Sequence, residues 1–209
     1  RQMCIRDRSM PEGDARVLDR ATHTIVQQVE AMKEMVNAFS DYARPPKMQA
    51  EPLDLDQLVA EVLELYRGVG GLEMELAGQA LRVDGDPLRL RQVVHNLVKN
   101  AQEAIAGRPE PQVRVETQVH SEGELQFLEL RVTDNGPGFD DQVMPRLFEP
   151  YVTTKARGTG LGLAIVKKIV EEHGGSILAQ NCGPGACVII RLPAVGQAPR
   201  QAGTDRARM

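Results

Sequence analysis

The sequence predicts an α+β domain in which helices lie on a mixed, mostly antiparallel sheet, with a separate helix in front of it. Residues 87–106 and 161–172 repeat apolar side chains at the helical period. Residues 113–119 and 125–132 alternate apolar with polar side chains, which is typical of two strands that form a hairpin. Helices and strands in this order form a layer of helices against one sheet.

The composition is that of a domain with an aliphatic core. Hydrophobic residues make up 42% of the 209 residues, but aromatic residues only 3%, and Trp is absent. The formal net charge is −4, whereas nucleic-acid binding needs a clustered basic surface, so we expect no nucleic-acid partner. Three cysteines without a C-x-x-C spacing indicate neither a disulfide framework nor a zinc site. No apolar run approaches the ~20 residues that span a membrane.

The apolar pattern in the first part of the chain predicts a helix that packs against other helices. Its apolar seam advances by steps of four and three, as in a helical bundle. The seam consists of Ile25, Val29, Met32, Val36 and Phe39. We assign residues 14–46 to a dimerisation helix that ends at two prolines, and expect a second copy of the chain to cover it. Packing on its own domain is the alternative. Residues 1–13 are expected to be an unstructured or non-native leader.

The domain that we place at residues 51–193 begins with a short strand and a helix. The strand is expected at 53–55, and Asp56 is the expected N-cap of the helix that follows. Two further short strands are expected at 72–76 and 81–83.

The next helix has a clear start. Asp86 is its expected N-cap and Pro87 occupies the first helical position, where the missing N–H costs nothing. The helix is expected to run to about Ala106. Its inward-facing residues are expected to be Leu88, Val93, Leu97, Val98, Ala101 and Ile105.

The rest of the domain is expected to consist of a hairpin, a long loop, a helix and a final hairpin. A long loop separates the first hairpin from the helix, and a loop of this length inside a compact domain is usually functional. The loop spans residues 135–158 and the helix spans 161–172. The strands of the final hairpin are expected at 177–180 and 186–192, and the tail 194–209 is expected to be disordered.

Two asparagines lie on one face of the helix 87–106. Asn96 and Asn100 are four residues apart, and asparagine is a poor helix former, so the pair needs a reason. A carboxamide oxygen is a hard, neutral ligand that suits Mg²⁺, which keeps most of its waters. Two surface or capping asparagines are the alternative.

Asp134, Gly136 and Gly138 follow the second strand of the hairpin. A carboxylate at a strand end can accept a hydrogen bond from an exocyclic amine such as that of adenine. The glycines let a ligand approach the backbone closely and permit a positive φ. A plain turn is the alternative, because these are also common turn residues.

A glycine-rich run opens the helix 161–172. Glycines at a helix N-terminus expose N–H groups, and the helix dipole favours an anion there, so the run predicts a phosphate cradle. It is neither a Walker loop, which needs Gly-Lys-Ser/Thr, nor a Rossmann fingerprint, which follows a strand. The run consists of Gly158, Thr159, Gly160, Leu161, Gly162 and Leu163.

The order of these three clusters resembles the Bergerat (GHKL) ATP-binding fold shared by sensor histidine kinases, gyrase, Hsp90 and MutL. Residues 147–155 look like the F-box and lid of histidine kinases, and 160–166 with 173–175 look like their second glycine box. Residues 24–44 resemble the second dimerisation helix of nitrogen-regulation sensor kinases of the NtrY type, so the chain resembles an N-terminally truncated member of that subfamily.

The resemblance implies ATP and Mg²⁺ as cofactors. Asn100 would be the metal ligand and Asn96 would assist at the phosphates. Asp134 would bind the adenine amine, with Gly136 and Gly138 lining the base. Lys155 would reach the γ-phosphate, and the N–H groups around 160–163 would hold the phosphate chain.

The implied parent transfers the γ-phosphoryl group of ATP to a histidine and then to an aspartate on a response-regulator receiver domain. It would act as a homodimer through the dimerisation helices. The resemblance places this chain in the cytoplasm, with membrane attachment only through a missing upstream segment. The alternatives are a serine-phosphorylating anti-sigma-type kinase and a non-catalytic ATP-binding dimerisation module.

Two features depart from the family pattern. The phosphoacceptor stretch, His-Glu/Asp-x-x-x-x-Pro, does not occur in this sequence. His23 lies on the wrong helix, and we expect structural positions for His95 and His173. Ala186 stands where many relatives have a threonine, which predicts a weaker contact on the adenine side.

Overall fold

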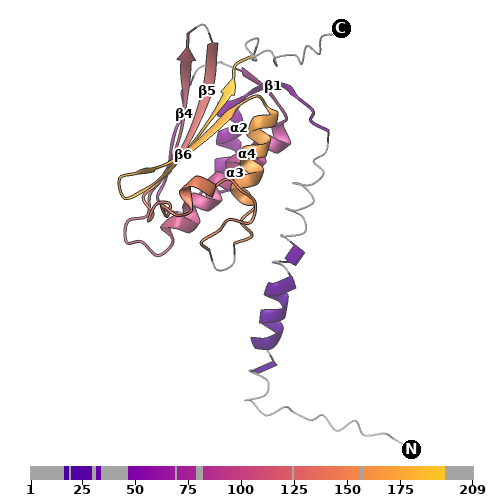
Figure 1. The fold of residues 1–209 in the computed structure, drawn as a ribbon, viewed down its shortest axis with the longest axis vertical. Helices are drawn as coiled ribbons and strands as arrows, with labels where there is room; N and C mark the ends of the chain where they lie inside the picture. The colour runs from indigo at the N-terminus through magenta and orange to yellow at the C-terminus, as the bar shows by residue number, and fades with distance from the viewer. Residues whose placement is uncertain are drawn as a thin grey trace, which may run out of the picture.

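The computed structural model describes residues 17–18, 20–29, 32–33, 47–68, 70–78, 82–123, 125–155 and 158–195. Most of them form a two-layer domain, in which the helices lie on one face of a twisted sheet (Figure 1). The predicted α+β class and the mixed, mostly antiparallel sheet are therefore confirmed.

The main sheet has five strands in the order β2-β4-β5-β7-β6. Only β2 and β4 pair in parallel, and the other neighbours are antiparallel. Both predicted hairpins are present, and their strands are longer than the sequence pattern indicated. The strands are β2 Leu72–Glu75, β4 Val113–Glu122, β5 Leu125–Asp134, β6 Ser176–Cys182 and β7 Gly185–Pro193.

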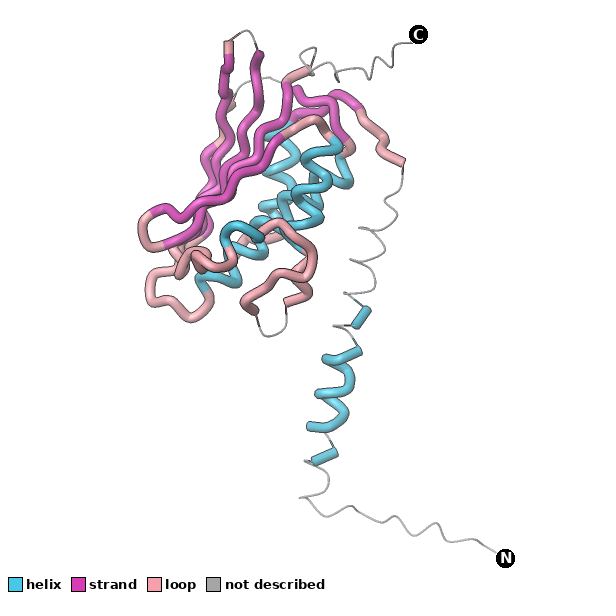
Figure 2. The backbone as a smooth tube through the Cα atoms, in the orientation of Figure 1, coloured by secondary structure: helices cyan, strands magenta, loops and turns pink. Residues whose placement is uncertain are grey.

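Three helices cover one face of this sheet (Figure 2). Helix α3 packs against both α2 and α4 and against β4 and β5, so it lies at the centre of the core. The core is aliphatic, as the composition indicated, and includes Val59, Val93, Val98, Leu130 and Val166, all fully or almost fully buried. The helices are α2 Leu55–Glu64, α3 Pro87–Ile105 and α4 Gly162–Glu172.

A small second sheet joins the start of the domain to the residues before α3. Strand β1, Glu51–Asp54, pairs antiparallel with β3, Arg82–Gly85. The N-cap of α2 is Asp54, whose carboxylate accepts a hydrogen bond from the N–H of Gln57, so the prediction of Asp56 as the cap was wrong. Asp56 instead accepts hydrogen bonds from the N–H of Gly78 and the hydroxyl of Thr117.

Helix α3 begins as predicted, because the Asp86 carboxylate accepts hydrogen bonds from the N–H groups of Leu88 and Arg89. The predicted burial of Leu88 was wrong: its side chain is 74% exposed. Leu88 precedes Leu97 by nine residues, or about two and a half turns, so the two side chains lie on opposite faces of the helix.

The fold extends past the expected boundary at residue 193. Ala194 is only 4% exposed, and its N–H donates to the carbonyl of Gln126. The N–H of Val195 donates to the carbonyl of Arg82. These backbone bonds tie both residues to the domain, and the rest of the expected tail lies outside the described residues. The expected loop 135–158 contains a 3₁₀ helix at Met144–Arg146.

The described residues before the domain, 17–18, 20–29 and 32–33, are helical. Within the predicted seam, Ile25, Val29 and Met32 are 63%, 58% and 67% exposed in the single chain. Val36, Phe39 and the leader 1–13 lie outside the described residues. None of the helices in the described part of the chain combines the length and hydropathy that crossing a membrane requires.

Candidate nucleotide-binding site

Asn100 and Lys155 meet although 55 residues separate them in the sequence. Asn100 lies on α3, and Lys155 lies in the loop between β5 and α4. The Lys155 Nζ donates to Asn100 Oδ1 at 3.2 Å and also forms an ion pair with Glu103. The loop therefore places a cation beside the predicted metal ligand.

The start of α4 lies beside the same asparagine. A Cβ built on Gly162 would be 3.7 Å from Asn100 Nδ2. Leu161 is the N-cap residue of α4 and its side chain makes no capping hydrogen bond. The Leu161 N–H itself donates to the Thr159 hydroxyl at 3.4 Å. The first N–H groups of α4 thus lack a side-chain cap next to Asn100, as an anion site at a helix N-terminus requires.

Asp134 ends β5 and turns its carboxylate back onto the backbone. Asp134 Oδ1 accepts hydrogen bonds from the N–H of Gly136 at 2.8 Å and of Ala186 at 3.4 Å. Burial raises the pKa of the Asp134 carboxyl above its ordinary value, although both N–H donors and the charges of Arg108 and Lys155 act in the opposite direction. The charge of Lys155 is therefore close enough to Asp134 to favour the ionised carboxylate.

The two glycines after Asp134 occupy positions where a side chain would collide. A Cβ on Gly136 would be 2.7 Å from Asp134 Oδ1 and 2.9 Å from the Cβ of Ala104. Gly138 has φ 78°, and a Cβ there would be 2.8 Å from Asn181 Oδ1. Ala104 follows Asn100 by four residues on α3, so it connects the Asp134 turn to the face that carries the asparagine.

A backbone contact closes the base of the loop that carries Lys155. The Tyr151 N–H donates to the Gly160 carbonyl at 3.0 Å. Gly160 has φ 68°, and a Cβ there would be 2.5 Å from the Tyr151 carbonyl carbon. A Cβ on Gly158 would be 2.4 Å from the side-chain oxygen Oγ1 of Thr153. Leu147, from the segment that resembles the F-box, is buried.

Two of the predicted residues are less closely connected to the others. Asn96 is half-buried one turn before Asn100, and among the described residues no hydrogen bond joins it to the rest of the site. The side chain of Leu163 packs against the hydrophobic core, which leaves only its backbone N–H for a ligand.

Sequence reasoning missed two residues that the structure places at the site. Asn181 brackets Phe139: its Oδ1 accepts from the Phe139 N–H at 2.7 Å and its Nδ2 donates to the Phe139 carbonyl at 3.0 Å. Glu103 holds Lys155. The position of Glu103, three residues after Asn100 on the same helix face, was the one signal in the sequence. The sequence held no signal for Asn181, because an asparagine next to a hairpin turn is ordinary.

The histidines of the domain have structural partners, as expected. His173 is buried, and its Nε2 accepts a hydrogen bond from the Asp86 N–H at 2.9 Å. His95 Nδ1 lies 2.7 Å from the Tyr66 hydroxyl. His23, on the N-terminal helix, is hydrogen-bonded to Gln27 at 2.8 Å.

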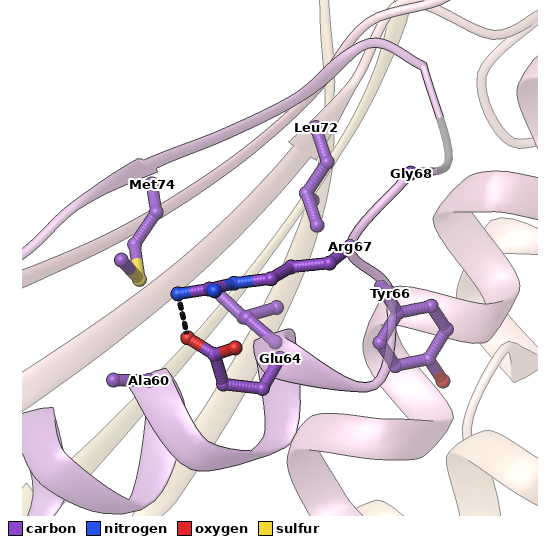
Figure 3. A pocket seen from close by; sticks show the side chains of 8 residues that line it. Ala60, Glu64, Tyr66, Arg67, Gly68, Leu72 and Met74 are labelled. Atoms are coloured by element: carbon purple, nitrogen blue, oxygen red, sulfur yellow. Dashed lines mark hydrogen bonds and ion pairs between the residues drawn. The ribbon is translucent and has the colours of Figure 1, made fainter.

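A separate hollow of about 270 Å³ lies between the end of α2 and strand β2 (Figure 3). Two of its lining residues, Arg67 and Glu64, form an ion pair. None of the predicted site residues lines it. Its lining residues are Ala60, Leu63, Glu64, Tyr66, Arg67, Gly68, Leu72 and Met74.

The donor set around Asn100 suits a metal with few protein ligands. Within the described ranges, no group of three or more His, Cys, Asp or Glu residues is arranged to hold a metal ion. Mg²⁺ commonly takes one or two protein oxygens and completes its octahedron with waters and phosphate oxygens. One carboxamide oxygen beside an uncapped helix start fits that pattern.

The comparisons with known proteins agree with this geometry. Residues 85–196, more than half of the chain, match the model of the "Histidine kinase-, DNA gyrase B-, and HSP90-like ATPase" family. The chain therefore belongs to this family of ATPases. The nitrogen regulation protein NtrY of Azorhizobium caulinodans is 37% identical over 197 residues, which cover 92% of this chain and 25% of that protein. The chain thus spans about a quarter of the length of this relative.

Solved structures show the same relationship. A mycobacterial sensor histidine kinase, MprB, has a TM-score of 0.59 and 32% identity, with 70% of this chain and 98% of that chain covered. The histidine kinase ThkA, solved in complex with the response regulator protein TrrA, has a TM-score of 0.69 and 25% identity, with 84% and 51% covered. The predicted resemblance to sensor histidine kinase catalytic domains, and to the NtrY type, is confirmed.

Proposed function

We propose that this chain is the ATP-binding catalytic part of a two-component sensor histidine kinase. It would transfer the γ-phosphoryl group of ATP to a histidine on a first dimerisation helix, from which an aspartate of a response regulator receives it. The observation that carries this proposal is the convergence of Asn100, Lys155 and the start of α4 at Gly162. The similarity to sensor kinases such as NtrY supports it.

The nucleotide would lie between the turn after β5 and the start of α4. The Asp134 carboxylate would accept a hydrogen bond from the adenine amine, with Gly136 and Gly138 lining the base. The uncapped N–H groups of α4 would bind the phosphates, helped by the helix dipole. Lys155 would contact the γ-phosphate, and Asn96 would assist on the phosphate side.

Mg²⁺ would be held by Asn100 Oδ1 together with phosphate oxygens and water. A bound Mg²⁺ supplies charge neutralisation for the transferring phosphoryl group. The chain's own residues orient the phosphates and stabilise their charge, and such positioning and electrostatics supply most of the catalysis in phosphoryl transfer.

The division of the chain follows from this function. Residues 14–46 would be the second dimerisation helix, 51–193 the catalytic domain, 1–13 a leader and 194–209 a tail, with Ala194 and Val195 added to the domain by their backbone bonds. The exposed seam at Ile25, Val29 and Met32 supports a homodimer, because a second chain would bury it.

The partner of the parent protein would be a response-regulator receiver domain. The complex of ThkA with TrrA supports this proposal. By similarity to NtrY, the chain would lie in the cytoplasm and the parent would be anchored in the inner membrane.

The function is tested by supplying the missing acceptor. We expect the chain, incubated with γ-labelled MgATP and a separate helix that carries a His-Glu stretch, to label that helix with an acid-labile, base-stable phosphate. Asn100→Ala should abolish both this transfer and the Mg²⁺-dependence of nucleotide binding. Stable label on the chain itself, an acid-stable phosphoserine, or tight MgATP binding without any transfer would each contradict the proposal.

A further inference from the structure

Glu103 links helix α3 to the loop that carries Lys155. The Lys155 Nζ donates to Asn100 Oδ1 at 3.2 Å and forms an ion pair with the Glu103 carboxylate. Glu103 stands three residues after Asn100, so the two side chains lie on the same face of α3. The ammonium is therefore held between a neutral amide and a carboxylate, both from one turn of one helix.

This ion pair adds little to the stability of the fold. Both side chains are 42% exposed, and exposed ion pairs are weak because water screens the charges and two long side chains must be ordered. Lysine carries its charge on a flexible four-carbon stem and loses much rotamer freedom when the ammonium is fixed. The main consequence of the pair is that it determines where the ammonium lies.

We propose that Glu103 is a positioning residue, which keeps the Lys155 ammonium beside Asn100 so that this lysine meets the terminal phosphate of a bound nucleotide. The inference rests on the proposed function, in which Asn100 faces the metal and the phosphates. When a nucleotide binds, Lys155 Nζ exchanges its bond to Asn100 Oδ1 for one to a phosphate oxygen, while Glu103 retains it. The Asn100 oxygen is then free for the metal.

Ordering Lys155 before the nucleotide arrives increases affinity. A side chain that is already fixed loses less conformational freedom on binding, so more of the phosphate contact is retained as binding free energy. The lysine also neutralises the Glu103 carboxylate, which would otherwise repel the phosphates. The ordered ammonium acts at the terminal phosphate of ATP, so its ordering favours ATP over ADP.

The test compares MgATP with MgADP binding by titration calorimetry. We expect Glu103→Gln to weaken MgATP binding about three- to tenfold, the factor set by ordering one long side chain, and to leave MgADP binding unchanged. The double variant with Lys155→Met should bind MgATP no more weakly than Lys155→Met alone, because Glu103 acts through the lysine. Glu103→Asp, which keeps the charge, should recover part of the loss.

A matched control is Glu61→Gln. Glu61 forms an ion pair of nearly the same exposure with Arg91, 41% and 43%, between α2 and α3. Glu61→Gln should change neither the MgATP affinity nor the MgADP affinity. One outcome is that the wild-type protein binds MgATP tightly while Glu103→Gln leaves that affinity unchanged or increases it. In that case the proposed positioning role of Glu103 is wrong and the proposed function stands. If the folded wild-type protein binds no MgATP, both are wrong.

Discussion

Gly185, the first residue of β7, lies directly against the backbone of Asp134 at the end of β5. A Cβ built on Gly185 would be 1.8 Å from the Asp134 carbonyl oxygen and 2.8 Å from the Cα of Asn135. Gly185 is buried, and β5 and β7 each pair with another strand on their far side, which restricts how far the two strands can separate. This close approach lets the Ala186 N–H reach the Asp134 carboxylate. The position of the candidate adenine-binding carboxylate therefore depends on a glycine in the opposite strand.

Gly185→Ala is expected to lower the free energy of unfolding by about 1–3 kcal/mol, because the added methyl group overpacks the strand pair. The displaced Asp134 should also weaken ATP binding in the protein that remains folded. Thermal unfolding and calorimetric titration measure the two effects. Gly70→Ala is the control, since a Cβ at Gly70 meets nothing within 4 Å. Equal stability of the two variants would show that the strands tolerate the methyl group.

Asp134 should make nucleotide affinity depend on pH. Burial raises the pKa of its carboxyl, so the acceptor for the adenine amine is lost as pH falls through a range above the ordinary carboxyl pKa of 3.8. We expect ATP affinity to decrease through that range and to level off above it. Folding stability has the opposite sign: the folded protein binds the proton more readily than the unfolded chain, so deprotonation lowers stability as pH rises.

Asp134→Asn removes the titrating carboxyl group. The amide presents an N–H₂ group as well as an oxygen, and one of its ends must face the N–H donors of Gly136 and Ala186. ATP affinity should fall by about tenfold or more, as for a lost charge-assisted hydrogen bond, and its acid dependence should vanish. A variant that binds ATP as the wild type does, with the same pH dependence, would exclude Asp134 from the site.

Local signals in the sequence were enough for most of the fold. Asp86 and Pro87 mark the start of α3, and the alternating pattern marks the first hairpin, because caps, proline and strand periodicity act over a few residues. The N-cap of α2 was assigned wrongly because two positions competed locally. Asp54 and Asp56 are both capable caps, and the tertiary contact of Asp56 with Gly78 and Thr117 decided between them.

The candidate site was only partly accessible to sequence reasoning. Asn100, Asp134 and the glycines were recognisable because the order of their three clusters along the chain resembles that of a known ATP-binding fold. Glu103 was not, because a glutamate on a helix surface is usually a solvated residue. Its partner Lys155 lies 52 residues away, so the pair follows from the path of the loop and not from any local pattern.

Ala186→Thr should strengthen nucleotide binding. The register Thr133↔Cys187 continues to Asp134 opposite Ala186, and the Ala186 N–H already lies 3.4 Å from Asp134 Oδ1. A threonine hydroxyl there can donate to the carboxylate and favour its ionised form. We expect a severalfold gain in ATP affinity and a shift of its acid dependence to lower pH, both measured by titration. A loss of stability with no gain in affinity would show that the buried position cannot accept the larger side chain.

His173 joins the far ends of the two helices that form the site. Its Nε2 accepts a hydrogen bond from the Asp86 N–H at the start of α3, and its Nδ1 lies 2.7 Å from the Ile169 carbonyl on α4. Nε2 must be unprotonated to accept, and Nδ1 must carry the proton to donate, so this arrangement holds one neutral tautomer. The adjacent ion pair of Arg89 with Glu172 connects the same two helices.

This arrangement predicts that the fold loses stability below neutral pH. Burial lowers the pKa of His173 below its ordinary value of 6.5, so between these two values the unfolded chain binds a proton that the folded protein does not. The contribution of His173 is therefore present above pH 6.5 and is lost as pH falls below it. His173→Leu should reduce this pH dependence in chemical denaturation and cost about 1–3 kcal/mol at neutral pH, since the Asp86 N–H loses its acceptor. His120→Gln, in the β4–β5 hairpin, is the control, and an undiminished slope in His173→Leu would assign the titration to another group.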